Sequence, residues 1–260
     1  MIRPVGTPIA ASRTQSEHAR RKLHVLDWLV PGRDALALAL LAVAAVAIGV
    51  GVGVLRGGAH AGGVLALVLG ALSYAIAVGR VAGSGVALLA LLLVAQAGHS
   101  VEHVVQLAQV YLLDLPGVAS QGFLVVANVE WVHAAWSSGV ALGAIALLAF
   151  GLRTPWAWLL LLWSLAHAGE HGYLLFRSLQ VQAAMADLGV PPASAVQALP
   201  GILGRDGWLA TSPFASWCSS VPGLITAPRP VVHFVWNAGE MLLLVAAASG
   251  WRRLLRERRP

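Results

Sequence analysis

Long apolar runs, separated by short polar stretches, follow a polar and basic beginning of the chain. A helix needs about 20 apolar residues to cross the hydrocarbon core of a bilayer. Runs of about this length lie at 35–55, 60–79, 85–113, 129–151, 155–176 and 230–250. The first run is longer than the apolar core of a signal peptide, so we interpret it as a retained anchor. The pattern predicts an all-α, polytopic membrane protein with six transmembrane helices.

The same pattern divides the chain into five regions. We predict a basic cytoplasmic segment, a two-helix membrane hairpin, a first repeat formed by spans three and four, a second repeat formed by spans five and six, and a basic cytoplasmic tail. The second repeat contains a long extracytoplasmic loop, which is either a lid over a site or a connector resting in the membrane interface. The boundaries are 1–34, 35–84, 85–151, 155–250 with loop 177–229, and 251–260.

Composition excludes an ordinary soluble enzyme. The chain is 58% hydrophobic and 11% charged, whereas soluble domains carry about 25% charged residues. The single cysteine, Cys218, allows no intrachain disulfide, and we interpret it as a packing residue. Phosphate loops, GxGxxG turns and GxSxG elbows do not occur in the sequence, which argues against nucleotide-driven chemistry.

The positive charges predict an orientation. If both termini are cytoplasmic, thirteen of the seventeen Lys and Arg residues lie inside and four lie outside, as the positive-inside rule requires. The net charge of +6 then reflects contact with anionic lipid headgroups on the cytoplasmic side, and we expect no nucleic-acid partner. The marked excess of Arg over Lys is typical of a GC-rich bacterial genome, so we predict a bacterial plasma (inner) membrane protein.

Two HxxEH motifs place ionisable residues inside apolar runs. The first, GHSVEH, contains His99, Glu102 and His103, and the second, AHAGEH, begins with His167. Positions i, i+3 and i+4 share an arc of about 100° on a helix, so each motif is expected to point two imidazoles and one carboxylate in one direction. The remaining members of the second motif are Glu170 and His171.

Spans four and six each begin with a related pattern. His133 and His233 each follow a valine and precede a tryptophan by three residues and a glycine by six. We therefore predict a duplicated two-helix unit, in which spans three and four form the first copy and spans five and six form the second. The two copies together predict a four-helix bundle around a polar site near the extracytoplasmic face.

A metal centre explains why so many ionisable groups lie at one depth, because each costs about 2.5–3.5 kcal/mol to insert and imidazoles and carboxylates are ligands for zinc, iron or copper. Six imidazoles exceed the ligands of one zinc ion, which indicates either two metal ions or one metal ion together with proton-handling residues. The expected ligands are His99, His103, His133, His167, His171 and His233; the expected acid–base groups are Glu102 and Glu170; the expected outer partners are Glu130, Asn237 and Glu240.

HxxEH resembles the signature of the inverzincin zinc peptidases, a resemblance that covers 99–103 or 167–171. It implies two zinc-binding histidines and a glutamate acting as general base. The chain is also similar to membrane di-iron desaturases and alkane hydroxylases in its intramembrane histidines, but it differs from their HxxxH and HxxHH spacings and from their cytosolic location. We assign the chain to neither family.

A metal transporter would need polar groups from the site to the cytoplasm, and the inner halves of spans three to six offer little beyond Gln96, Ser137, Ser138 and Ser164. Three other interpretations of the site follow from the sequence. The first is a membrane metalloenzyme acting on a lipidic, small hydrophobic or gaseous substrate. The second is a haem-b-type electron carrier in which two histidines are axial ligands. The third is a non-catalytic centre, either a metal-handling or structural subunit of a membrane complex or a metal-free Glu–His network that holds the helices together.

Overall fold

The structure is a computed structural model that describes residues 70–72, 76, 83–115, 119–120, 122, 129–189 and 199–257, the last seven of these by their backbone alone. All regular secondary structure in these ranges is α-helical, as predicted. The predicted segment 1–34 and the first two predicted spans lie outside the described residues, apart from helical positions at 70–72 and 76.

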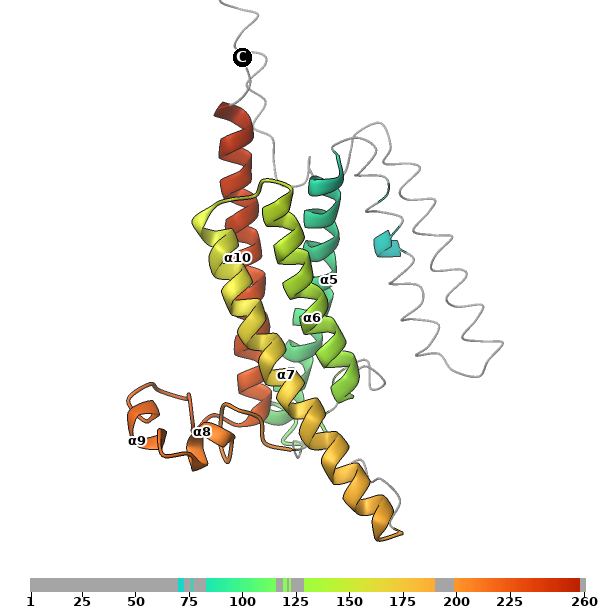
Figure 1. Ribbon diagram of the computed structural model, residues 1–260, viewed down its shortest axis with the longest axis vertical. Coiled ribbons are helices and arrows are strands. Elements are labelled where there is room, and N and C mark those ends of the chain that lie inside the picture. The colour runs from blue at the N-terminus through green and yellow to red at the C-terminus, as the bar shows by residue number, and fades with distance from the viewer. Residues whose placement is uncertain are drawn as a thin grey trace, which may run out of the picture.

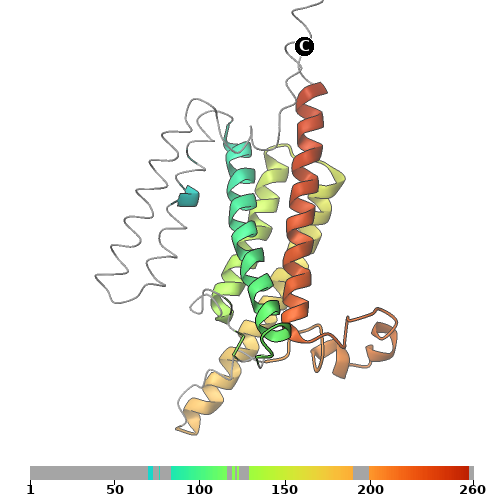
Figure 2. The same cartoon turned by 180° about the vertical axis from the view of Figure 1, so that it is seen from behind.

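Four long helices form the body of the described chain (Figures 1 and 2). They are α5 (Ser84–Tyr111), α6 (Glu130–Ala149), α7 (Pro155–Asp187) and α10 (Arg229–Glu257). α6 packs against α7, α10 packs against both α7 and α5, and α5 packs against α6. The four helices therefore surround a common interior, and chain direction alternates from one helix to the next (Figure 1).

Three of these helices are long and apolar enough to cross a membrane: α5, α6 and the part of α10 from Arg229 to Gly250. α7 is not among them, because His167, Glu170 and His171 lower its hydropathy. The helices nevertheless place large apolar residues on their outer surfaces and polar residues inside, which is the arrangement expected in lipid. The outward residues include Val101, Leu142, Leu162, Leu165 and Leu242.

Local sequence explains where the helices begin and end. Thr154 caps α7 by accepting a hydrogen bond from the Ala157 backbone N–H at 3.2 Å, and Pro155 occupies the first helical position. Gly151 adopts a positive φ of 94° in the turn between α6 and α7. α7 continues eleven residues past its predicted end at 176, because 177–187 contains helix-forming Leu, Gln, Ala and Met residues and no Gly or Pro.

The end of the bundle where α5 and α7 begin is closed by apolar side chains. Leu147, Leu152, Leu160 and Leu244 are almost fully buried there, together with several alanines. Because lipid is as apolar as leucine, close packing rather than burial from water holds such an interface together. The polar residues of the interior lie toward the opposite end, where α6 and α10 begin.

The segment between α7 and α10 lies beside that polar end. It contains two short helices, α8 (Trp208–Thr211) and α9 (Ala215–Cys218), which sit to one side of the bundle in both views (Figures 1 and 2). Its aromatic residues Trp208, Phe214 and Trp217 are exposed. The segment is therefore partly helical, and these aromatic rings do not cover the interior of the bundle.

Candidate metal centre

Six histidines from all four long helices meet inside the bundle. Five of them are buried, and His99 is half-buried. Each ring has at least one neighbouring imidazole with a centroid 4.7–5.9 Å away, so the six form one connected cluster. The structure thus brings together every histidine that the sequence places in the four spans from 85 onward.

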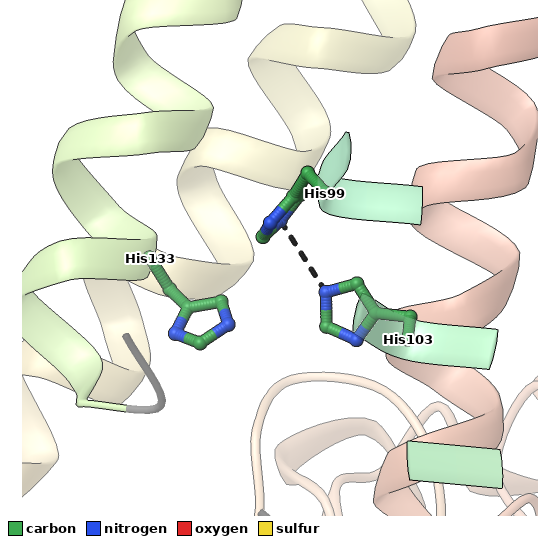
Figure 3. A group of neighbouring side chains, drawn as sticks. All are labelled: His99, His103 and His133. Atoms are coloured by element: carbon green, nitrogen blue, oxygen red, sulfur yellow. Dashed lines mark hydrogen bonds between the residues drawn. The ribbon is translucent and has the colours of Figure 1, made fainter. Parts of the chain in front are cut away.

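The first triad, His99, His103 and His133, is the tightest part of this cluster. One ring nitrogen from each of the three residues lies within 4.8 Å of the other two, a spacing that could hold a metal ion. Figure 3 shows the three rings, two from α5 and one from α6, facing the same space between the helices. The Nε2 atoms of His99 and His103 are 3.3 Å apart.

Hydrogen bonds fix the rings of two members of the first triad. His103 Nδ1 lies 2.7 Å from Gln106 Oε1, and His133 Nδ1 lies 3.3 Å from the backbone oxygen of Val129. Both partners can only accept, so each Nδ1 carries the proton. The opposite nitrogen, Nε2, is then unprotonated, as in a metal-binding imidazole. In His103 this nitrogen accepts a hydrogen bond from His99 Nε2 (Figure 3).

The second triad, His167, His171 and His233, comes from α7 and α10. All three side chains are buried, and the Nε2 atom of each has no hydrogen-bond partner among the described residues. Leaving one buried polar atom without a partner costs about 1–3 kcal/mol. Three such atoms in one place make this part of the cluster a candidate for a bound ion or water.

Two carboxylates lie behind the second triad. Glu240 Oε1 is 3.0 Å from His167 Nδ1, and Glu130 Oε2 is 3.9 Å from His171 Nδ1. Arg229 pairs with the other oxygen of Glu130 and also donates to the backbone oxygen of Leu199. Glu130 and Glu240 are thus placed where the sequence expects partners of histidine ligands, and Arg229 joins Glu130 to the segment that follows α7.

A buried hydrogen-bond network lies next to the histidines. Gln96 Nε2 donates to Asn237 Oδ1 at 2.9 Å and to Glu240 Oε2 at 2.8 Å. Trp136 Nε1 donates to Gln96 Oε1 at 3.1 Å. The Asn237 amide also donates to the backbone oxygen of His233. The network links α5, α6 and α10 and holds Glu240 beside His167.

Two tryptophans line the cluster in equivalent positions. The indole of Trp136 is 4.9 Å from the ring of His99, and that of Trp236 stacks on His167 at 5.4 Å with an interplanar angle of 6°. Trp163 donates a hydrogen bond to the backbone oxygen of Trp236 and packs where Gly239 leaves space. These rings restrict the positions that His99 and His167 can adopt.

The glutamates of the two HxxEH motifs meet the loops that follow their helices. Both oxygens of Glu170 accept hydrogen bonds from the backbone N–H of Ile202, and one also accepts from Leu203, at 3.1–3.2 Å. Gly201 and Gly122 lie so close to Glu170 and Glu102, respectively, that a methyl group at either position would overlap the carboxylate. Their role as acid–base groups stays a prediction, and the geometry of Glu170 favours holding the loop.

The site predicted from the sequence omits three of its polar residues. Gln96 and Gln106 lie three residues before His99 and three after His103, so they extend the histidine face of α5. Arg229 lies four residues before His233 on α10 and was assigned only to an outer segment. Helical spacing therefore places all three residues on the same faces as the histidines. Which atoms they contact becomes clear only from the packing of α6 and α10.

Comparison with protein-family models, with curated proteins and with solved structures finds no match to this chain.

Proposed function

We propose that this chain is an integral membrane metal-binding protein whose metal centre lies between the helices of the bundle. Three described helices can cross a membrane by length and composition, and the first triad is compatible with a metal site. The observation that carries the proposal is the shared orientation of His103 and His133. Each has its Nδ1 held by an oxygen, so that its Nε2 is unprotonated and lies near a nitrogen of His99.

The donor set is compatible with zinc, iron or copper. Three protein ligands with an open fourth position are typical of catalytic zinc, whereas structural zinc sites are closed by four. We therefore favour a membrane metalloenzyme. Bound zinc would supply Lewis-acid chemistry for hydrolysis, and iron or copper would supply redox chemistry. His99 is only half-buried, so access is expected past this residue for a lipidic, small hydrophobic or gaseous substrate.

Ring spacing argues against haem as the cofactor. A haem-b centre places a flat macrocycle between two axial imidazoles. His133 and His233 have centroids 5.9 Å apart, and the ring of His171 lies 5.1 Å from the first and 4.9 Å from the second. The space that a macrocycle would need is therefore occupied by other imidazoles.

The apolar end of the bundle argues against a transport path. A metal transporter needs polar groups on both sides of its binding site. In the described chain the polar network continues from the histidines to Gln96, and beyond it lie the buried Leu147, Leu160 and Leu244. A polar centre with an apolar end of the bundle on one side favours catalysis or metal storage over conduction.

The orientation and the duplication belong to the same proposal. We place both termini in the cytoplasm of a bacterial cell, the anionic headgroups of the inner membrane against the basic ends, and the metal centre near the extracytoplasmic face. Six spans are proposed, with spans three to six as two copies of one unit. The equivalent pairs Trp136–His99 and Trp236–His167 support the duplication.

Elemental analysis of the detergent-purified protein, combined with its visible absorption spectrum, tests the metal proposal. We expect at least one equivalent of zinc, iron or copper, no Soret band, and a loss of about one equivalent in His103→Ala. His60→Ala is the matched control, because it removes a histidine that belongs to neither HxxEH motif and to neither valine–histidine pattern of the sequence, and it should keep the wild-type content. A Soret band, or no metal after loading with each of the three ions, would overturn the proposal.

A second measurement addresses catalysis. If the bound metal is iron or copper, oxygen uptake in the presence of a quinol is expected; if it is zinc, hydrolysis of a lipid ester or peptide bond is expected. The activity should disappear in His103→Ala and persist in His60→Ala. A metal-loaded protein without any of these activities would leave metal handling as its function.

A further inference from the structure

The second triad, His167, His171 and His233, is not needed for the metal site just proposed. Its rings contact the first triad directly: His171 stacks on His133 at 5.1 Å with an interplanar angle of 20°, and His233 lies 5.7 Å from His103. The Nε2 atoms of all three rings are buried without a hydrogen-bond partner among the described residues, while the Nδ1 atoms of His167 and His171 face carboxylates. These three Nε2 atoms are more deeply buried than the ring of His99 in the first triad, which is half-buried.

We propose that the second triad binds a second metal ion, so that the cluster is a dinuclear centre; this inference rests on the proposed metal-binding function. The Nε2 atoms of His167, His171 and His233 would be the ligand atoms. All three are buried and have no partner in the described chain. Imidazole nitrogens of this kind suit zinc, copper and iron.

The outer partners of the second triad support this assignment. Glu240 lies 3.0 Å from Nδ1 of His167, and Glu130 faces Nδ1 of His171 at 3.9 Å. A carboxylate on the far nitrogen of a histidine fixes the tautomer that exposes Nε2 and raises the basicity of the ligand. Gln96 and Arg229 hold these two carboxylates in place.

Most ring contacts of the first triad have an equivalent in the second triad when each histidine is exchanged for its counterpart in the other repeat. Exchanging His99 with His167, His103 with His171 and His133 with His233 converts the His99–His103 contact into His167–His171, and the His103–His133 contact into His171–His233. The same exchange converts His103–His233 into His171–His133. The His99–His133 contact has no counterpart between His167 and His233 among the described ring contacts, and only the first triad brings one nitrogen of each ring within 4.8 Å of the others. The second triad therefore matches the first in its residues and in three of its contacts, but it is more open.

Charge also favours a second ion in this position. Two dications in a buried site need compensating negative charge, because their mutual repulsion is weakly screened there. Glu240 is fully buried beside His167, and its hydrogen-bond partner Gln96 carries no charge. Glu130 is paired with Arg229, so Glu240 is the carboxylate behind the second triad whose charge would stabilise a second cation.

Zinc stoichiometry separates this inference from the proposed function. The full-length protein in detergent is stripped with a chelator, loaded with zinc, freed of excess ion and measured by elemental analysis. We expect two zinc ions per chain in wild type and in His60→Ala, one in His103→Ala, one in His171→Ala, and none in the double variant. The single zinc that remains in each single variant shows that the variant is folded.

The outcomes that overturn the inference are distinct. One zinc in wild type that is lost in His103→Ala and retained in His171→Ala would refute the second site and leave the first intact. Two zinc ions retained in His171→Ala would place the second ion elsewhere and also refute the inference. No zinc in wild type would refute both proposals.

Copper loading supplies a second readout. With Cu²⁺ in place of zinc, wild type should give the electron paramagnetic resonance spectrum of two coupled ions, because the rings of the two triads are adjacent. His103→Ala and His171→Ala should each give the spectrum of an isolated ion with nitrogen ligands. An isolated-ion spectrum in wild type loaded with two copper ions would contradict a dinuclear centre.

Discussion

The two triads use the same residue type and similar contacts, but their surroundings differ. In the first triad, the oxygens behind the rings are neutral, from Gln106 and the backbone of Val129. In the second triad they are carboxylates, from Glu240 and Glu130. Because a carboxylate partner makes imidazole a stronger ligand than an amide does, equal ligand sets are expected to bind metal with unequal affinity.

A second difference concerns the hydrogen bonds at the edge of each triad. The indole N–H of Trp136 is satisfied by Gln96. The corresponding residues of the other copy are Trp236 and Ser164, and neither Trp236 Nε1 nor Ser164 Oγ has a hydrogen-bond partner among the described residues. The residues at the edge of the first triad are therefore hydrogen-bonded within the protein, whereas those at the edge of the second have polar atoms left over for a bound ion or water.

The largest expected effect comes from His133, which contacts both triads. Its ring lies within 6 Å of His99 and His103 on one side and of His171 and His233 on the other. His133→Ala should remove one zinc ion and weaken the binding of the other about tenfold. Among the described histidines, the ring of His99 contacts only the two others of its own triad. His99→Ala should therefore remove one ion and leave the binding of the other unchanged. Equal effects in zinc titrations would contradict the assignment of ligands to triads.

Exchanging the outer partners should reverse the difference in affinity. Glu240→Gln replaces the carboxylate beside His167 by a neutral amide of the same shape, and should lower zinc affinity at the second triad by about 10–100-fold. Gln106→Glu should raise affinity at the first triad by about tenfold. Competition with a zinc-binding dye measures both constants. If neither changes, the outer partners do not tune the ions.

The contact between Glu170 and the loop that follows α7 can be tested without removing a histidine ligand. Gly201→Ala should destabilise the protein by about 1–3 kcal/mol, because the new methyl group overlaps Glu170. Gly169→Ala is the matched control. Gly169 directly precedes Glu170 in the helix and has open space around it, so this substitution should be neutral or slightly stabilising. Thermal unfolding in detergent measures the difference. Equal midpoints for the two variants would contradict the close contact.

Glu170→Gln distinguishes a loop-holding role from a base. An amide oxygen can accept the loop N–H groups but cannot take up a proton. The variant should therefore lose about 1 kcal/mol of stability or less, keep its full metal content, and keep its activity if Glu170 only holds the loop. Retained metal with abolished turnover would instead establish Glu170 as the base that the motif predicts.

The smallest effect is expected at Cys218, in α9. It lies outside both triads in the segment beside the bundle, so Cys218→Ser should change neither zinc content nor affinity. Loss of zinc in this variant, measured by the same elemental analysis, would show that the segment between α7 and α10 contributes a ligand that both the sequence and the structure leave out.

The apolar runs of the sequence predicted the helices around the site well, because these runs have clear ends. The predicted spans 85–113 and 129–151 correspond to Ser84–Tyr111 and Glu130–Ala149. The prediction was less accurate for α7, since helix propensity rather than apolarity determines its last eleven residues. The six-span count stays a prediction, with its first two spans outside the described residues.

The site was predictable in its histidines but not in its outer contacts. Spacing of three and four residues places His99 and His103 on one face of a helix whatever surrounds it. The direction of the Glu170 carboxylate depends instead on where the Ile202 backbone lies, which is a tertiary contact 32 residues away. Gln96 is likewise recognisable only through its bond to Glu240, 144 residues along the chain.

X-ray absorption at the metal edge of the purified, metal-loaded protein tests the central claim most directly, because it reports the atoms bound to the ion. We predict nitrogen ligands at about 2.0–2.1 Å, with the outer-shell scattering pattern of about three imidazoles per ion. In His99→Ala, which is expected to keep only the ion of the second triad, the same pattern per ion should remain at about half the metal content. A spectrum of oxygen ligands alone, or of a porphyrin, would contradict a histidine-bound metal centre.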